Sequence, residues 1–231
     1  MDLSRLSIIV PTKNEEKNIV RFLKSIPAGI EVILIDASTD QTLELAEAAR
    51  PEIITIRNSE LNIAAARQHG ATYSKRDWLL FTDSDIHFSP LYFKHILDLP
   101  VGDAYYGEKR TASSKFRTYD FLFRLGQGII DRLGIPSASG SNMIIHKQAF
   151  TDVGGFDIEL SCNEDTEIFF RLHKQKKHIQ FVPQLVVVSH DDRRLESGVV
   201  RKLTHSFLRS VGLYFDILNK KQRNSDWGYW K

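Results

Sequence analysis

The sequence contains a single cysteine, Cys162, in 231 residues. A lone cysteine cannot form an internal disulfide, so a disulfide-stabilised secreted scaffold is excluded and a reducing compartment is favoured. The chain also has no apolar run of the ~20 residues that a membrane-spanning helix needs. Residues 1–5 lack the layout of a signal peptide, since they lead directly into a strand-like run. We therefore expect a cytoplasmic protein, with a peripheral position at the inner face of the membrane left open.

A strong charge of either sign is also missing. Lysine and arginine number 31 and aspartate and glutamate number 29, which gives a net charge of +2. This balance offers no general basis for binding nucleic acid, and we expect no nucleic-acid partner. Hydrophobic residues (42%) and charged residues (26%) are present in the proportions of an ordinary globular protein. A chain of this length can bury a substantial core within one domain.

What the sequence does have is a regular alternation of strand and helix patterns. Apolar runs and helical spacing predict strands at 6–10, 32–35, 53–56 and 78–82 and helices at 19–26, 42–49 and 63–73. Such alternation is typical of parallel βαβ units, so we expect an α/β fold with a mostly parallel, doubly wound sheet. The second half is less regular, with strands predicted at 103–107, 143–146, 179–182 and 185–188 and helices at 113–133, from 163, and at 198–220.

Two carboxylates stand at the end of the fourth predicted strand. Asp83 and Asp85 are separated by Ser84, and alternate residues of an extended segment point to the same side. The pair can therefore converge on one hard cation, at the carboxyl edge where open α/β sheets bind ligands. Asp36 ends the second strand and would share that edge. Taken alone, an Asp-x-Asp pair is more often a solvated acidic turn.

Further segments favour a cation site over a solvated turn, because their order resembles that of the family-2 glycosyltransferases. The segments that carry the resemblance are 7–16 (SIIVPTKNEE), 35–42 (IDASTDQT), 66–70 (ARQHG), 82–85 (TDSD), 140–143 with 153–157 (GSNM and VGGFD) and 163–167 (NEDTE). The similarity runs from about Ser7 to His190. It implies an inverting, nucleotide-sugar-dependent enzyme with a single GT-A-type domain, in which residues 1–107 bind the nucleotide sugar. Residues 108–192 would form the acceptor and catalytic half, followed by a basic C-terminal helix and tail at 193–231.

The resemblance also implies roles for individual residues. The donor side would comprise Pro11, Thr12, Asn14, Glu15, Asp36, Arg67, Asp83, Ser84 and Asp85. The acceptor side would comprise Gly140, Ser141, Asn142 and Glu164, with Asp165 as the catalytic base. A divalent cation, Mg²⁺ or Mn²⁺, would be held mainly by Asp85 with help from Asp83. His190, at the end of the last predicted strand, is a further metal-ligand candidate, and a buried or capping histidine is an equally good interpretation.

The sequence departs from the family pattern at some positions. Only Asp36 is present where two acidic residues are usual, and Gln68 stands where asparagine is commoner. The Gln-x-x-Arg-Trp motif of processive polymerases is absent, which favours transfer of one sugar. The expected reaction moves a sugar from a nucleoside diphosphate sugar to a hydroxyl of a sugar, a lipid-linked acceptor or another acceptor, with inversion. Such a reaction serves the synthesis of cell-envelope polysaccharide, glycolipid or another glycoconjugate.

Two alternatives and one surface stay open. A haloacid-dehalogenase-type phosphatase also has an Asp-x-Asp at a strand end, and a non-catalytic nucleotide-sugar-binding subunit would keep the fold. The C-terminal helix, 198 to about 220, is expected to pack on the domain with a loose tail, and the alternative for the segment 198–231 is docking on an anionic membrane. Its basic residues and the aromatic tail of Trp227, Tyr229 and Trp230 would suit that alternative. The aromatic helix predicted at 113–133 would line an acceptor site.

Overall fold

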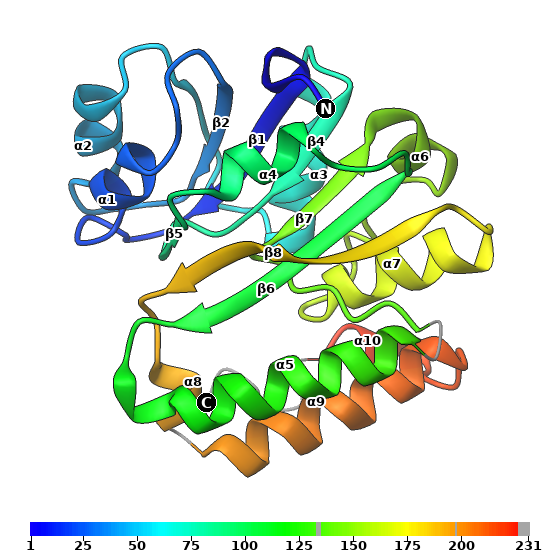
Figure 1. The fold of residues 1–231 in the computed structure, drawn as a ribbon. Helices are drawn as coiled ribbons and strands as arrows, with labels where there is room; N and C mark the ends of the chain where they lie inside the picture. The colour runs from blue at the N-terminus through cyan, green and yellow to red at the C-terminus, as the bar shows by residue number, and fades with distance from the viewer. Residues whose placement is uncertain (133–134, 197, 226–231) are drawn as a thin grey trace.

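A twisted sheet runs through the middle of the protein (Figure 1), and the computed structural model describes residues 1–132, 135–196 and 198–225. In these residues eight strands form one sheet in the order β3-β2-β1-β4-β7-β6-β8-β5. Their bounds are β1 Leu6–Thr12, β2 Glu31–Asp36, β3 Ile54–Arg57, β4 Trp78–Phe81, β5 Ile86–Phe88, β6 Ala104–Thr111, β7 Met143–His146 and β8 Ile179–Ser189.

The sheet is mostly parallel, as the alternating pattern predicted. β1 pairs in parallel with β2 and with β4, β2 pairs in parallel with β3, and β6 pairs in parallel with β8. β7 runs antiparallel to both of its neighbours, β4 and β6, and β5 runs antiparallel to β8. The expected single α/β domain is therefore confirmed, and its carboxyl-terminal strand ends gather at one edge.

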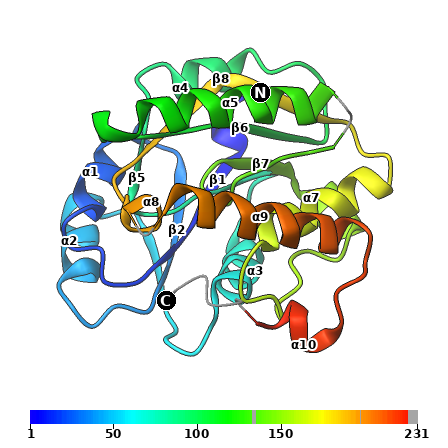
Figure 2. The same ribbon diagram turned by 90° about the horizontal axis from the view of Figure 1, so that it is seen from below.

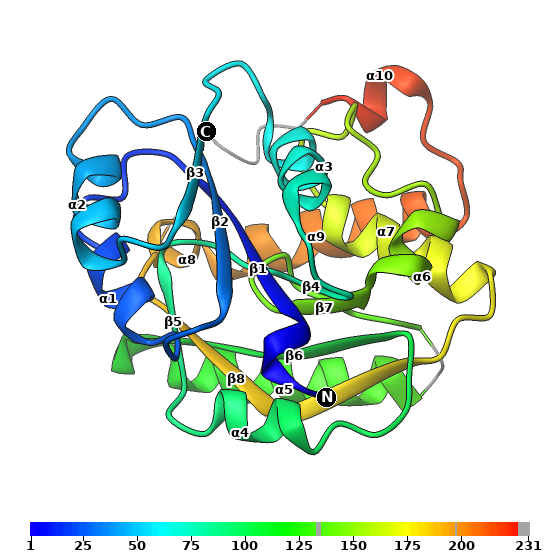
Figure 3. The ribbon, with the colours of Figure 1, turned by 90° about the horizontal axis from the view of Figure 1, so that it is seen from above.

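Helices cover both faces of this sheet (Figures 1 and 3). Their bounds are α1 Ile19–Lys24, α2 Thr42–Ala49, α3 Ile63–Tyr73, α4 Tyr92–Leu97, α5 Arg117–Arg132, α6 Lys147–Asp152, α7 Glu164–Lys174, α8 Arg193–Glu196, α9 Val199–Tyr214 and α10 Lys220–Arg223. Two short 3-10 helices are η1 Leu3–Arg5 and η2 Ser114–Phe116. Within the described residues, none of the helices is both long and apolar enough to cross a bilayer.

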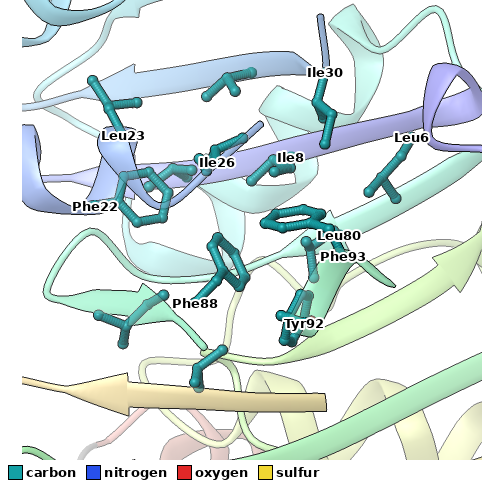
Figure 4. Packing of buried hydrophobic residues seen from close by; sticks show 14 of the residues in the cluster. Leu6, Ile8, Phe22, Leu23, Ile26, Ile30, Leu80, Phe88, Tyr92 and Phe93 are labelled. Atoms are coloured by element: carbon teal, nitrogen blue, oxygen red, sulfur yellow. The ribbon is translucent and has the colours of Figure 1, made fainter. Parts of the chain in front are cut away.

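The alternation of side chains along each strand separates the core into two layers. In β1, Ile8 and Val10 pack with Phe22 of α1 and Tyr92 of α4, in the cluster drawn in Figure 4. Ile9, between them, points to the other face and belongs to the cluster that includes residues of α3, α6 and α7. Each of these apolar side chains is fully or almost fully buried, which contributes roughly 1.5–3 kcal/mol per residue.

The structure corrects the prediction of two strands at 179–182 and 185–188. They form the single strand β8, and the register against β6 shifts so that Gly107 pairs with Val182 but Glu108 pairs with Val186. Pro183 lies within this shift. A proline has no N–H for the ladder, so the irregularity accommodates it without ending the strand. The elements β5, α4 and α6 are additions that the patterns did not predict.

The predicted long C-terminal helix at 198–220 is also wrong in its extent. α9 ends at Tyr214, because Asp216 adopts a positive φ of 53° and the chain turns before α10. α10 and Ser225 are hydrogen-bonded to α9. The fully buried guanidinium of Arg209 donates to the carbonyls of Gln222 (3.1 Å), Arg223 (2.7 Å) and Ser225 (2.6 Å). The aromatic tail residues Trp227, Tyr229 and Trp230 lie outside the described residues, as does Leu133 at the end of the predicted helix 113–133.

The shift between β6 and β8 yields a stability prediction. A methyl group at Gly107 would meet the backbone carbonyl of Leu185 and lie 2.6 Å from its Cβ. Gly107→Ala should therefore lower stability by about 1–3 kcal/mol, with a fall in Tm of roughly 2–4 °C for each kcal/mol. Gly126→Ala in α5 is the matched control, because nothing lies within 4 Å of its new methyl group. Equal melting temperatures in thermal unfolding would contradict the tight approach of β8 to β6.

Candidate functional site

A cleft of about 270 Å³ opens at the carboxyl edge of the sheet. Asp83 and Asp85 enter it from the end of β4, and Asp165 enters it from the start of α7. The loop 137–141 and the β6 residue Lys109 complete its polar side, and Tyr119 and Phe123 of α5 line the other side. The structure thus brings the predicted metal pair and the predicted base into one cleft.

Arg67 of α3 connects the segments that meet there. Its side chain is 1% exposed, and its guanidinium forms ion pairs with Glu164 and with Asp83, the latter at 2.7 Å between Nη2 and Oδ1. Nη2 also donates to the carbonyl of Gly140 at 3.0 Å. Arg67 lines the cleft and is paired there with protein carboxylates, so it fixes the position of Asp83. Its role as a donor contact stays a prediction.

The loop at Gly140 and Ser141 holds two of the carboxylates. The N–H of Gly140 donates to Oδ2 of Asp165 at 2.6 Å. The hydroxyl of Ser141 donates to Oδ2 of Asp83, and it accepts a hydrogen bond of 2.8 Å from Nζ of Lys109. A Cβ at position 140 would lie 2.7 Å from the Arg67 guanidinium, so only glycine fits here. Two residues of one loop therefore orient Asp83 and Asp165.

Asp165 begins α7 next to Glu164. Its Oδ1 accepts a hydrogen bond from the N–H of Thr166 at 2.7 Å, which leaves both carboxylate oxygens oriented by backbone donors. Glu164, predicted for the acceptor side, lines the cleft and is buried against Arg67. Burial raises the pKa of Glu164 to about 7, because the attraction of Arg67 only partly offsets desolvation and Asp165 adds negative charge.

Asp85 has the features of an unsatisfied cation ligand. Among the described residues, its Oδ1 is buried without a hydrogen-bond partner. Its pKa is raised to about 6, mainly by burial and also by the charges of Asp83 and Glu15, while Lys109 opposes the shift. A buried carboxylate with an unused lone pair and acidic neighbours fits a divalent cation. The described chain holds no ready-made group of three ligand side chains, so the ion would take most of its ligands from elsewhere.

His190 lies beside this site with its ring turned to other partners. Its backbone N–H donates to the carbonyl of Asp85 at 2.8 Å. Its ring Nε2 lies 2.8 Å from Nδ1 of His87, and its Nδ1 lies 2.9 Å from Nη1 of Arg21. Burial and the charge of Arg21 lower the pKa of both histidines. The backbone hydrogen bond to Asp85 keeps His190 next to the predicted metal site, but its ring does not line the cleft. Its role as a metal ligand stays a prediction.

The predicted nucleotide residues lie farther along the same sheet edge. Thr12 ends β1 and Asp36 ends β2, and the two are register partners. Within the described part of the chain, Thr12 Oγ1 and Asp36 Oδ2 are buried without hydrogen-bond partners, although Arg57 Nε lies 3.6 Å from Asp36 Oδ2. Buried acceptors of this kind are rare unless a ligand or water satisfies them. They support the prediction that the second strand end contacts a ligand.

The remaining donor-side residues hold the loops around these acceptors. Asn14 has a positive φ of 57°, its N–H donates to Ser38 Oγ at 2.9 Å, and its Oδ1 accepts from the N–H of Thr39 at 2.9 Å. The N–H of Glu15 donates to Thr42 Oγ1 at 2.8 Å. Pro11 precedes Thr12 in β1, and Ser84 is buried between the two carboxylates of the Asp-x-Asp segment. Burial raises the pKa of Glu15, which Asn18 opposes by a hydrogen bond.

Asn142, predicted for the acceptor side, has a structural role in this fold. It is fully buried, its Oδ1 accepts from the hydroxyl of Tyr92 at 2.6 Å, and its Nδ2 donates to the carbonyls of Glu108 and Leu185. These contacts use its hydrogen-bonding groups to tie the start of β7 to β6, β8 and α4. The β6–β8 irregularity leaves carbonyls that need a donor, and Asn142 supplies it. Its acceptor-side role stays a prediction.

Lys109 and Asp191 line the cleft but were not predicted. Lys109 follows a predicted strand by two residues, and only the pairing of β6 with β8 places it opposite Asp85 and Ser141. A predicted strand that continued to Thr111, as β6 does, would have included Lys109. The antiparallel pairing of β5 with β8 sets His87 beside His190, a contact that the sequence patterns did not predict.

The comparison with known proteins adds the family. The model of Glycosyl transferase family 2 matches residues 7–154, which is more than half of the 231-residue chain. An uncharacterized glycosyltransferase of Haemophilus influenzae is 29% identical over 181 residues, which make up 72% of this chain and 61% of that relative. The chain therefore spans less than two thirds of the length of this curated relative.

Two solved structures share the fold at low sequence identity. The mannosyltransferase PcManGT of Pyrobaculum calidifontis, in complex with GDP-Man and Mn²⁺, has a TM-score of 0.66 at 19% identity, over 80% of this chain and 56% of that chain. S. aureus TarS in complex with UDP-GlcNAc has a TM-score of 0.64 at 21% identity, over 81% and 58%. The α/β architecture is thus that of the GT-A glycosyltransferases. By the extent of the family match, the chain belongs to glycosyl transferase family 2.

Proposed function

We propose that the protein transfers a single sugar, with inversion, from a nucleoside diphosphate sugar to an acceptor hydroxyl, in the synthesis of a glycoconjugate. The observation that carries this proposal is the shared loop of Gly140 and Ser141. It hydrogen-bonds Asp165 through Gly140 and Asp83 through Ser141, so a base candidate and the Asp-x-Asp segment face one cleft. Membership of the family supports sugar transfer as the reaction class.

Asp85 would hold a divalent cation, with Asp83 assisting and His190 as a further candidate. The unpartnered, buried Oδ1 of Asp85 and the acidic neighbours that raise its pKa support this assignment. When bound, Mg²⁺ or Mn²⁺ would supply positive charge that stabilises the diphosphate leaving group. Mg²⁺ commonly takes one or two protein carboxylates and completes its ligands with substrate phosphates, which agrees with the small number of protein ligands here. PcManGT, in complex with GDP-Man and Mn²⁺, offers a precedent on the same fold.

Asp165 would act as the general base. The acceptor oxygen attacks the anomeric carbon, the bond from that carbon to the diphosphate oxygen breaks, and the hydroxyl proton passes to Asp165. Attack from the face opposite the leaving group gives inversion. Backbone N–H groups of Gly140 and Thr166 hold the carboxylate in a fixed orientation, which is what a base needs before it can meet the hydroxyl.

The two alternatives differ from this proposal in testable ways. A phosphatase of the haloacid dehalogenase type would use Asp83 as its nucleophile, but both oxygens of Asp83 are engaged, by Arg67 and by Ser141. A non-catalytic binding subunit would need no oriented Asp165 in the cleft. Release of phosphate from a phosphomonoester, assayed with and without EDTA, distinguishes the phosphatase. Metal-dependent donor binding without turnover distinguishes the binding subunit.

A thermal-shift screen tests the donor side directly. UDP-, GDP-, dTDP- and CMP-sugars are each added with Mn²⁺, and one nucleotide class should raise Tm in a manner that EDTA reverses. Binding that does not depend on the metal would contradict the role of Asp85. No stabilisation by any of the four classes would contradict the proposed donor.

Asp165→Asn should separate binding from chemistry. The amide keeps the shape but cannot accept the proton, so transfer should fall by about 10²–10⁴-fold while the donor-induced thermal shift is retained. Asp85→Ala should lose both. The matched control is Asp98→Asn, because Asp98 is an exposed residue that follows α4 away from the cleft. Normal transfer by Asp165→Asn, measured as released nucleoside diphosphate, would show that another group is the base.

The raised pKa of Asp85 predicts a gain in stability when the carboxylate is removed. Its pKa is about 6 in the folded protein against 3.8 for the unperturbed group, so the metal-free folded state binds the proton more tightly than the unfolded state. Folding stability is therefore lost as the pH rises from about 4 to about 6, on the order of 2–3 kcal/mol. In EDTA, Asp85→Asn should raise Tm more at pH 8 than at pH 5. A gain that is equal at both pH values would contradict this reasoning.

A further inference from the structure

Large apolar side chains are exposed on two helices beside the cleft. On α5 they are Phe121, Leu122, Leu125 and Ile129, between 49% and 59% exposed, and on α9 they are Val200, Leu203, Phe207 and Leu208, between 42% and 74% exposed. On each helix the successive spacings are three and four residues and one adjacent pair, which places the four side chains along one stripe. We call these eight side chains the docking face. Exposed apolar side chains grouped on a protein surface indicate an interaction site.

Both helices of the docking face also line the cleft. Tyr119 and Phe123 of α5 line the cleft, and so does Ser210 of α9. Both helices lie along the lower side of the molecule in Figure 1, and the view from below in Figure 2 shows α5 in front of β6 and α9 in front of α7. The cleft that contains Asp165 is therefore lined by residues of both helices that carry the apolar stripes.

The exposed charged residues of α5 are basic. Arg117, Arg124 and Arg132 of α5 are exposed, whereas its acidic residues are partly buried. Asp131 accepts a hydrogen bond from the hydroxyl of Tyr106 at 2.6 Å, and Asp120 accepts one from the N–H of Thr111 at 3.0 Å. The sequence of α9 contains no aspartate or glutamate. An apolar stripe flanked by arginines, as on α5, complements an anionic lipid surface.

We propose that α5 and α9 dock the protein on an anionic membrane and turn the cleft toward a lipid-linked acceptor. This inference rests on the proposed function, since it names the acceptor class of the same site. A membrane can contact both stripes while it delivers the acceptor hydroxyl to the cleft. A protein partner or a second copy seated on both stripes would cover the cleft. The proposal shifts the membrane contact from the predicted segment 198–231 to a face that includes α5.

Cosedimentation with vesicles tests the docking face. Two vesicle types are used: phosphatidylcholine with phosphatidylglycerol in equal parts, and phosphatidylcholine alone. The full chain should sediment with the anionic vesicles and much less with the neutral ones, and salt should weaken its binding. The triple variant Leu122→Gln, Leu125→Gln and Phe207→Gln should lower the bound fraction about tenfold, because it removes apolar contacts from both stripes.

The chain offers a matched control for that variant. Leu91, Leu97 and Val101 are also exposed, at 56%, 51% and 91%, and lie around α4 away from the cleft. Their replacement by glutamine should leave vesicle binding unchanged. A second variant, Arg117→Gln with Arg124→Gln and Arg132→Gln, should lose binding to anionic vesicles only. Equal loss in the α4 control and the docking-face variant would overturn the proposal, as would absence of binding by the unmodified chain.

Two further measurements keep the outcomes distinct. Light scattering gives the oligomeric state, and a dimer that the docking-face variant converts to monomer would show that the face joins two copies. The donor-induced thermal shift with Mn²⁺ should be the same in the docking-face variant and the unmodified chain. Vesicle binding without any donor shift would leave the docking face standing and overturn the proposed function. A donor-induced thermal shift without vesicle binding would overturn the docking face and leave the proposed function standing.

Discussion

The site depends on one buried cation. Arg67 is almost completely inaccessible and is paired with Glu164 and Asp83. Removal of one partner from such a buried pair leaves an uncompensated charge, which costs about 3–5 kcal/mol. The network therefore fixes the end of β4 against the start of α7, although these segments are 81 residues apart in sequence (Asp83 and Glu164). Asp165 is positioned because its neighbour Glu164 cannot leave Arg67.

Gly140 is the second constraint, and it follows from the first. Its carbonyl accepts from Arg67 and its N–H donates to Asp165, so the peptide chain passes directly over the guanidinium. A side chain at this position would occupy the space of Arg67. Ser141 then reaches Asp83 from the same loop. The donor-side carboxylates and the base candidate are thus set by backbone geometry around one arginine, and the parallel sheet supplies only their common edge.

The sequence was sufficient for the parts of the molecule that local periodicity controls. The first three βα units, the ends of β2 and β4 and the start of α7 follow from apolar patterns, and they bring Asp36, Asp83 and Asp165 to one edge. The pairing of β5, β6 and β8 depends on contacts between distant segments, and local patterns do not contain it. The pairing of His87 with His190 and the structural role of Asn142 follow from that arrangement, which is why the patterns missed both.

The distribution of charge in the cleft is consistent with the proposed divalent cation. Arg67 is already shared between two carboxylates, and Lys109 is bonded to Ser141 while it opposes the raised pKa of Asp85. Asp85, Asp83 and Glu15 still repel one another strongly enough that burial and like charge together keep the pKa of Asp85 near 6. A neutral residue at position 85 would give a more stable fold than this buried carboxylate among acidic neighbours. A divalent ion that binds together with the diphosphate would neutralise the excess negative charge of these carboxylates. Such an ion would explain why a carboxylate stands at position 85.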